Sequence, residues 1–492
     1  MVVAASHSGA GKTTVVSILL RALRERGLTV QAFKIGPDFI DTAYHTEATG
    51  RPAVNLDLWM MGADGIKQSF DTFSADADIS VIEAMGALFD GADGTDVGSA
   101  AHLAKLLRVP VVVVLDVWGM TRTTGAVLDG IRGFDPELDI VGCVLNRVGG
   151  QKHAKMILGS LRPESRKLVA GTIVHRPELV VPERHLGLVT VEESPVSPAE
   201  RDEAYRRAAA DLDLDRLLSE IGRPSKPPIA ATPPAATPPA VTPPVATPPA
   251  VTPIAVTPIA VTPIAATPVA GRSVRARLAV ARDAAFCFYY EENLRLLQSA
   301  GFELVPFSPI RDRALPQRVD AIYFGGGYPE SFAGELAANT SLAAELRSRA
   351  AAGTPIYAEC GGLMYLGSGL TGYQGNRCAM ADVLPIEVVM DPRHLAIRYV
   401  EVHTRLPSLL GPAGTRLRGQ EFHQSRITSA AVAPDFFTAT SSDGASFQAG
   451  YASRNVVASY IHVHFGSNPQ AAQHFVASAL AARADRADAI SN

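Results

Sequence analysis

A glycine-rich loop near the start of the chain has the residue types of a phosphate site. Residues 6–14 read SHSGAGKTT, after a short apolar run and before a helical pattern. In that setting, loop amides and a helix N-terminus approach phosphate oxygens, a lysine reaches the outer phosphates and a threonine can hold magnesium. Ser6 replaces the first glycine of the strict motif, and a plain turn with an exposed lysine is the alternative. The predicted phosphate site consists of Gly9, Gly11, Lys12, Thr13 and Thr14, with Thr13 as a magnesium ligand.

Carboxylates follow other predicted strands in the same half of the chain. Residues 34–41 read KIGPDFID, so Asp38 and Asp41 lie close to Lys34 in the sequence. Glu83 ends a further apolar run, and Asn146 ends a later one. Acids at the carboxyl ends of parallel strands face the crevice where ligands bind, so we predict contacts with magnesium or substrate. A helix cap or a solvated loop charge is the alternative for each acid, and the asparagine amide could pair with a purine edge or form a turn.

A cysteine in the second half has the surroundings of a nucleophile. Residues 354–364 read TPIYAECGGLM, in which an apolar strand pattern leads to Cys360, two glycines and a helix-like run. A sharp strand-to-helix turn presents a nucleophile at the edge of a sheet, and the glycines let a substrate approach. The alternative is a packing residue, since free cysteines are often buried.

Two other segments could assist this thiol. Gly326 and Gly327 follow a predicted strand, and their amides suit an oxyanion. His462 and His464 lie two residues apart in a predicted strand near the end of the chain, so both side chains are on the same face. Either imidazole could take the thiol proton and return it to a leaving group, and only one need be the base.

Two α/β domains must position these residues. The first half alternates apolar runs with helical patterns, which is typical of a parallel sheet covered on both faces. Its predicted strands are residues 2–4, 30–34, 79–83, 111–116 and 140–146, and its predicted helices are 14–26, 99–107 and a closing helix at 202–221. The pattern restarts with predicted strands at 278–282, 303–307, 321–324 and 355–358 and predicted helices at 291–300 and 342–352.

A repetitive segment separates the two halves. Thr-Pro pairs recur every five residues from 232 to 267, and proline at this density favours an extended chain without a core. We therefore expect a first domain over 1–223, a disordered linker over 224–273 and a second domain over 274–484. Direct docking of the two domains is expected, with the linker as a passive tether.

Composition limits the function classes. Lys and Arg number 45 against 49 Asp and Glu, so the formal charge is -4 and no basic footprint for nucleic acid exists. The longest apolar run, 109–115, falls far short of the roughly 20 residues that span a membrane. The start has no signal-peptide pattern, and the four cysteines show no paired metal spacing or dense disulfide framework. We expect a cytoplasmic protein that acts on small molecules and binds neither nucleic acid nor membrane.

With these residues in view, the chain resembles the family of cobyrinic acid and hydrogenobyrinic acid a,c-diamide synthases. The resemblance covers nearly everything outside the linker. Its segments are SGAGKTT, KIGPDFIDTAYH, VLNRVGGQKH, LVVPERHLGL, ARDAAFCFYYEENL, FGGGYPESFA, PIYAECGGLMYL and EFHQSR. It implies two doubly wound domains, a dethiobiotin-synthase-like P-loop domain and a flavodoxin-like class I glutamine amidotransferase domain. In two departures, Gln420 stands where a histidine is common, and no glutamate lies two residues after His462, so a Cys-His dyad is expected.

The resemblance also implies a reaction. ATP would phosphorylate the a and c acetate carboxylates of a corrinoid, and ammonia from L-glutamine would displace the phosphate. In the amidotransferase domain it assigns nucleophile, base and oxyanion donors to Cys360, His462, Gly326 and Gly327. In the P-loop domain it assigns ATP and magnesium to Lys12 and Thr13, adenine to Asn146, and substrate or magnesium to Lys34, Asp38, Asp41 and Glu83.

Two alternatives remain at this point. The same chemistry could act on another acid, such as a nickel sirohydrochlorin, although ARDAAFCFYY and PERHLGL favour the corrinoid. From a different class, a nucleotide-switch ATPase could recruit partners through the Thr-Pro segment and carry a non-catalytic second domain. The sequence leaves open whether cobalt is in the ring, the order of the two amidations and whether the chain forms a homodimer.

Overall fold

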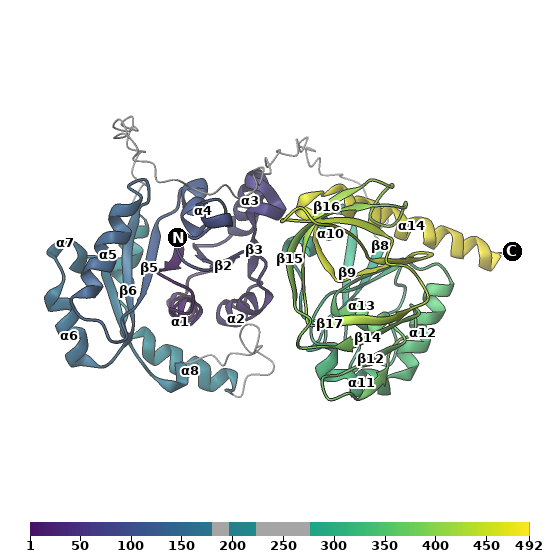
Figure 1. Cartoon of the computed structure of the whole chain (residues 1–492), viewed down its shortest axis with the longest axis horizontal. Coiled ribbons are helices and arrows are strands. Elements are labelled where there is room, and N and C mark those ends of the chain that lie inside the picture. Colours follow the sequence, from purple (N-terminus) through teal and green to yellow (C-terminus); the bar gives the residue numbers. More distant parts are fainter. Residues whose placement is uncertain (180–195, 223–275, 492) are drawn as a thin grey trace, which may run out of the picture.

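The computed structural model describes residues 1–179, 196–222 and 276–491. These residues form two α/β domains that lie side by side, as the sequence predicts (Figure 1). The predicted linker at 224–273 and the PERHLGL segment lie outside the described residues.

The first domain is built on a parallel sheet of seven strands. Its strands read as near-continuous apolar runs because both faces of the sheet are covered. In sheet order they are β3 (Val54–Leu56), β2 (Val30–Ile35), β4 (Ile79–Glu83), β1 (Val2–Ala5), β5 (Val111–Asp116), β6 (Ile140–Val148) and β7 (Val169–Val174). The central position of β1 places the loop that follows it among the carboxyl ends of its neighbours.

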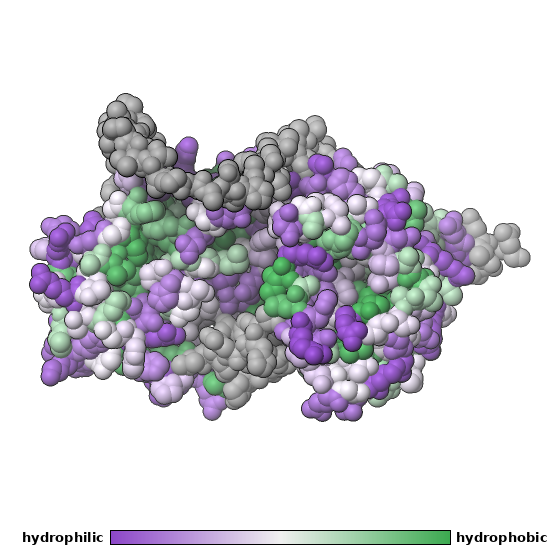
Figure 2. All heavy atoms as spheres, viewed as in Figure 1, coloured by the Kyte–Doolittle hydropathy of each residue, from purple (hydrophilic) through white to green (hydrophobic). Residues whose placement is uncertain are grey.

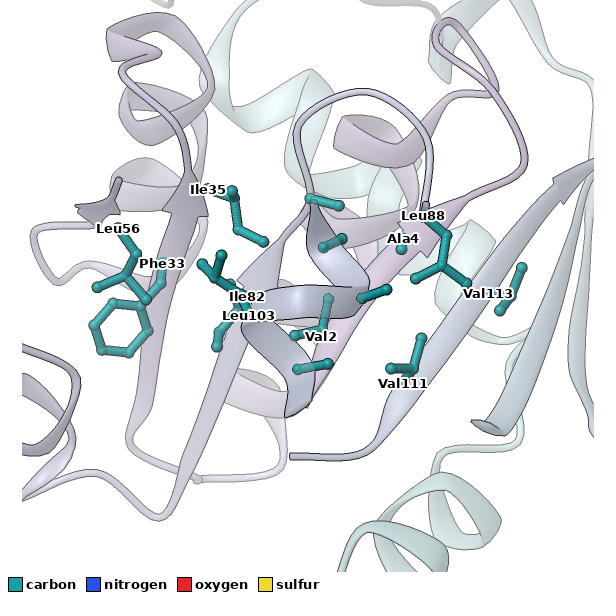
Figure 3. Close-up of a cluster of buried hydrophobic side chains, with 14 of the residues drawn as sticks. Val2, Ala4, Phe33, Ile35, Leu56, Ile82, Leu88, Leu103, Val111 and Val113 are labelled. Atoms are coloured by element: carbon teal, nitrogen blue, oxygen red, sulfur yellow. The ribbon is translucent and has the colours of Figure 1, made fainter. Parts of the chain in front are cut away.

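Helices cover both faces of this sheet. Buried side chains of α1 (Lys12–Glu25), α8 (Pro198–Ala209) and α9 (Leu214–Ile221) pack on one face. The opposite face packs against α3 (Leu58–Ser74), α4 (Ala100–Leu107), α5 (Thr123–Phe134) and α6 (Gln151–Ser160). Figure 3 shows this second core, where Val2, Ile82 and Leu103 meet between the sheet and α4. Two further helices are α2 (Phe39–Thr49) and α7 (Pro163–Arg166).

The prediction of one closing helix over 202–221 is wrong, because the segment forms α8 and α9. Between them the amide of Asp213 donates to the Ala170 carbonyl at 2.7 Å, and Leu212 bridges to Gly171 beside β7. The Asp213 carboxylate then caps α9 by accepting from the Arg216 amide. Backbone pairing with the sheet therefore interrupts a segment whose apolar spacing is helical throughout.

The second domain has a six-stranded sheet with a doubly wound order. In sheet order its strands are β20 (Tyr451–Ser453), β21 (Val456–Ser459), β11 (Ile356–Glu359), β10 (Ala321–Phe324), β8 (Ala276–Ala281) and β9 (Phe302–Phe307). Its helices are α10 (Glu291–Ala300), α11 (Ala333–Ala338), α12 (Thr340–Ala351), α13 (Gly361–Leu366) and α14 (Gln470–Ser491). Only β20 pairs antiparallel, and the five parallel strands follow the flavodoxin order 2-1-3-4-5.

Two smaller sheets complete this domain. One contains β19 (Ser446–Ala449), β18 (Phe437–Ser441), β15 (Ala396–Thr404), β16 (Arg416–His423) and β22 (Ile461–His464), all paired antiparallel. The other contains β13 (Arg377–Ala379), β12 (Gly369–Thr371), β14 (Ile386–Met390) and β17 (Ser425–Ala430). Apart from β22, the sequence analysis did not predict these strands. Polar residues interrupt the apolar ones in strands such as β15, which reads AIRYVEVHT, so no continuous apolar run marks them.

The two domains contact each other directly, with β15 and β16 facing α3 and β3 (Figure 1). The hydroxyl of Tyr399 donates to Asp57 at 2.6 Å, and Asp57 in turn caps α3. The Arg418 guanidinium donates to the Trp59 carbonyl at 3.0 Å and lies over the Trp59 ring. These contacts confirm the direct docking expected from the sequence.

Polar side chains dominate the face seen in Figure 2, with hydrophobic patches on both domains. Across the described ranges, no helix combines the length and the apolar character that crossing a membrane requires.

Candidate active sites

The loop after β1 has the backbone of a phosphate site. Gly9 and Gly11 have φ angles of 79° and 82°, a left-handed conformation that favours glycine. Helix α1 begins at Lys12, so the loop amides lie at a helix N-terminus, where an anion is stabilised. Burial, and next the positive charge of Lys34, lowers the pKa of Lys12. The Lys12 ammonium is thus incompletely solvated, so a bound anion would stabilise its charged form.

Asn146 and Thr14 also support this loop. The Asn146 side-chain amide donates to the Ala10 carbonyl at 2.9 Å, and the Thr14 hydroxyl donates to the Leu179 carbonyl at 3.3 Å. A Cβ on Gly11 would come within 2.3 Å of the Asn146 amide nitrogen, so only glycine fits there. Adenine binding by Asn146 and phosphate binding by Thr14 stay predictions.

The other predicted groups of this domain converge behind the loop. Glu83 is fully buried and accepts hydrogen bonds from the Thr13 hydroxyl at 2.8 Å and the Lys34 ammonium at 3.1 Å. Its second carboxylate oxygen lies 2.6 Å from Nε2 of His45. Lys34 also pairs with Asp41 at 2.5 Å. The structure thus joins groups from β2, β4, α1 and α2 in one buried network, to which the sequence analysis had not assigned His45.

Charges in this network shift one another's pKa. Burial alone raises the pKa of Glu83, but Lys34 and His45 outweigh it and bring this pKa to about 2. Burial lowers the pKa of Lys34, yet Asp41 and Glu83 together raise it above its ordinary value. Burial raises the pKa of Asp41 to about 6, with Lys34 opposing the shift. The Lys34 ammonium and the Glu83 carboxylate are therefore charged at neutral pH.

Asp38 caps helix α2. Its Oδ1 atom accepts from the amides of Ile40 at 2.8 Å and Asp41 at 3.0 Å. From the same domain, the Asn55 side chain donates to the carbonyls of Gly36 and Asp38 at 2.8 and 2.9 Å. The helix-cap alternative is therefore confirmed for Asp38, and its contact with a substrate stays a prediction.

Cys360 lies in a strained turn between a strand and a helix. Strand β11 ends at Glu359, helix α13 begins at Gly361, and Cys360 between them has φ 47° and ψ -103°. A non-glycine residue rarely adopts this conformation unless its surroundings impose it. The Cys360 amide donates to the Ser459 carbonyl at 2.7 Å, which fixes the turn on β21. The strand-to-helix turn predicted from the sequence is confirmed.

Replacing Gly362 by Ala should disrupt this turn. The new Cβ would lie 2.6 Å from the Phe324 Cβ and 2.7 Å from its carbonyl oxygen, so backbone must move. We expect thermal unfolding to show a loss of about 1–3 kcal/mol in the free energy of unfolding. Gly130→Ala in α5, where nothing lies within 4 Å, is the matched control and should not destabilise the protein. Equal stability of the two variants would contradict the tight turn.

A pocket of about 1280 Å³ opens beside the thiol. Cys360, Gly327, Glu330 and His423 are among the described residues that line it. Burial, and next the negative charge of Glu330, raises the pKa of Cys360. The resting group is therefore a neutral thiol, which needs a base to become a nucleophile.

The two glycines predicted to stabilise an oxyanion differ in their contacts. The Gly326 amide donates to the Phe288 carbonyl at 3.2 Å, because these residues form an antiparallel bridge. This bond engages the Gly326 amide, and an oxyanion contact from it stays a prediction. The Gly327 amide lies at the turn, where a Cβ on Gly361 would be 3.1 Å from its nitrogen. An oxyanion contact stays a prediction for Gly327.

His462 is buried on β22, close to Gly326. A Cβ on Gly326 would come within 2.3 Å of the His462 Cε1 atom, so the ring lies on the glycine backbone. Burial, and next the charge of His423, lowers the pKa of His462 to about 3, so its imidazole is neutral and, in this state, a weaker base than a solvated histidine. His464 has a structural contact, since its Nδ1 accepts from the Gly466 amide at 3.1 Å. The choice of His462 as base stays a prediction.

Glu359 and His423 are site residues that the sequence analysis missed. Glu359 accepts hydrogen bonds from the hydroxyls of Tyr323 and Tyr357 at 2.8 and 2.7 Å, and its burial raises its pKa to about 7. His423 lines the pocket and stacks on the Tyr460 ring at 3.7 Å. The position of Glu359 directly before the cysteine was an available signal. His423 lies on β16, a strand that was not predicted.

Comparison with known proteins identifies the class of each domain. Residues 1–189 match the family model of the CobQ/CobB/MinD/ParA nucleotide binding domain. Residues 277–470 match the model of the CobB/CobQ-like glutamine amidotransferase domain.

Curated relatives that match nearly the whole chain carry the name cobyrinate a,c-diamide synthase. The relative from Syntrophotalea carbinolica is 37% identical, with 97% of both chains covered. The relative from Caldanaerobacter subterraneus is 34% identical over 96% of this chain and 97% of its own. The relative from Leptospira interrogans is 36% identical over 98% of both chains. The chain belongs to this family.

Proposed function

We propose that this chain is a ligase that amidates the a and c acetate carboxylates of cobyrinic or hydrogenobyrinic acid in cobalamin biosynthesis, using ATP and L-glutamine. One observation carries the proposal. A phosphate loop with buried carboxylates and a cysteine in a strained turn lie on two domains in direct contact, as a two-site amidation requires. The near-complete match to cobyrinate a,c-diamide synthases supports the corrinoid as substrate.

The amidotransferase domain releases ammonia. The neutral His462 imidazole takes the thiol proton, and the Cys360 sulfur attacks the amide carbon of glutamine. The Gly327 amide stabilises the oxyanion, and the proton returns to the leaving nitrogen. Ammonia leaves, and water hydrolyses the remaining thioester to glutamate.

The P-loop domain activates the acid. A carboxylate oxygen of the corrinoid takes the γ-phosphoryl group of ATP, which leaves ADP and an acyl phosphate. Ammonia attacks the acyl carbon and phosphate departs, which forms the amide. The Lys12 ammonium stabilises the negative charge of the γ-phosphoryl group while this group is transferred. The other groups proposed at this site are Gly9, Gly11, Thr13 and Thr14 at the phosphates, Asn146 at adenine, and Lys34, Asp38 and Asp41 at the substrate.

The oxygens beside the loop fit a magnesium ion. The Thr13 hydroxyl lies 2.8 Å from Glu83 and 3.4 Å from Asp41, and hydroxyl and carboxylate oxygens suit this ion. No three His, Cys, Asp or Glu side chains among the described residues are grouped to hold a metal. Thr13 and Glu83 would therefore share the ion with phosphate and water oxygens. When bound, magnesium neutralises phosphate charge.

The test supplies cobyrinic acid and hydrogenobyrinic acid separately, with ATP, magnesium and glutamine. Mass spectrometry of the products should reveal a diamide from at least one acid, and ATP consumption should require both glutamine and the corrinoid. ATP hydrolysis that is independent of both, without amide, would favour a nucleotide switch instead.

Shortening the Thr-Pro segment should have little effect. Because the domains dock through their own side chains, the linker raises only the effective concentration, which changes slowly with tether length. Removal of three repeats is expected to keep the ratio of amide formed to glutamine hydrolysed. A large fall in this ratio, with ammonia-dependent synthesis intact, would assign a positioning role to the repeats.

A further inference from the structure

The first turn of α2 lies between the two proposed sites. Asp41 in this turn pairs with Lys34 in the network behind the phosphate loop. Phe39, two residues earlier, contacts the other domain, where its ring centroid lies 5.1 Å from that of His462. Both rings are buried, with exposed fractions of 8% and 2%. One helical turn therefore touches the phosphate site and the proposed base.

Phe39 belongs to a cluster of rings from both domains. It stacks on Phe288 at a centroid distance of 5.1 Å and an interplanar angle of 12°, and it contacts Tyr290 at 4.7 Å. The His462 ring also lies against the Gly326 backbone. A residue of the synthetase domain thus packs on the base of the amidotransferase domain.

No hydrogen bond to the Nδ1 atom fixes the orientation of the His462 ring in the described structure. In the described part of the chain, its buried Nδ1 atom has no hydrogen-bond partner. The nearest carboxylate oxygen, on Glu359, lies 4.0 Å away, which is too far for a hydrogen bond. A catalytic imidazole normally needs a third group to orient it. On the Nδ1 side no such hydrogen bond from the described residues holds the ring, which packs instead against other rings, with Phe39 among them.

The loop before Phe39 is also held from the amidotransferase domain. The Gln420 side chain donates to the Pro37 carbonyl at 2.9 Å. Gln420 and His462 are register partners on β16 and β22, so neighbouring positions of one sheet contact this loop. A shift of the α2 turn would therefore displace groups that contact or neighbour His462.

We propose that Phe39 is a positioning residue for glutamine hydrolysis, which orients His462 and makes its alignment depend on the α2 turn of the ATP domain. This inference rests on the proposed function. Truncation of Phe39 should leave His462 free to turn away from the thiol. The loss should appear in kcat for glutamine more than in KM, because the pocket that receives glutamine keeps its lining.

The test compares Phe39→Ala, Phe39→Leu and Trp59→Ala. Trp59 is a matched control, since its ring meets Tyr399 and Arg418 across the same interface, whereas the Phe39 ring meets His462. We expect kcat for glutamine hydrolysis to fall about 10- to 100-fold in Phe39→Ala, since small misplacements of catalytic groups have effects of this size. Phe39→Leu should recover part of the loss, and Trp59→Ala should differ from the unchanged protein by less than about threefold.

Synthesis from free ammonia separates the outcomes. It should persist in Phe39→Ala, and thermal unfolding should verify that each variant is folded. An unchanged glutamine kcat in Phe39→Ala, an equal loss in Trp59→Ala, or loss of ammonia-dependent synthesis in a folded Phe39 variant would each overturn the inference. Absence of amide from either nitrogen source in the unchanged protein would instead refute the proposed function.

Discussion

Replacing Cys360 by Ser is expected to abolish amide formation from glutamine while amide formation from free ammonia continues. The thiol is used only to release ammonia, and a serine hydroxyl is a far weaker nucleophile than a thiol or thiolate. The phosphate loop and its network lie on the other domain and should remain intact. Amide yield with each nitrogen source, measured by mass spectrometry, checks this expectation.

The serine variant should also fold as the unchanged protein does, because the substitution keeps the size of the side chain and the backbone of the turn. Circular dichroism and thermal unfolding provide this control. Loss of both activities in a folded variant would refute the separation of the two sites.

Replacing Lys12 by Ala should stop synthesis with either nitrogen source. The variant lacks the cation that follows the transferring phosphoryl group, and a loss of about a hundredfold or more is expected from removal of such a contact. The measurement is corrinoid-dependent release of ADP together with amide formation from ammonia. The exposed Lys155 of α6 offers a matched control, since Lys155→Ala removes the same charge from the surface of a different helix. Unchanged ammonia-dependent synthesis in Lys12→Ala would show that the loop is not the ATP site.

Much of the fold could be predicted because its central strands are continuous apolar runs. Strands β4, β5 and β10 and helix α10 have the bounds expected from the sequence. Antiparallel strands such as β15 were missed since polar residues interrupt their apolar ones. The break between α8 and α9 was missed because it depends on backbone pairing with β7, which no local pattern reveals.

The site residues also differ in whether a local sequence pattern reveals them. Motifs that are contiguous in the sequence, such as the glycine loop and the cysteine turn, were placed correctly, because the local backbone determines them. His45 reaches Glu83 through buried packing across 38 residues of sequence, so its role was not visible, whereas the position of Glu359 next to Cys360 was a signal that could have been used. The pairing of the Gly326 amide with the Phe288 carbonyl was likewise not visible in the sequence.

The pairing of β16 with β22 has a consequence for how the protein assembles. Side chains alternate between the faces of a strand, so a slip of β22 by one residue against β16 would turn His462 away from the face on which Gln420 meets the ATP domain. The two strands are about forty residues apart in the chain, and their register must form before the surface that receives the α2 turn exists. The β16–β22 pairing therefore has to be in place before the α2 turn can dock on it. A nascent chain would carry a folded phosphate loop before any competent glutaminase, and ammonia release would begin only after its recipient is in place.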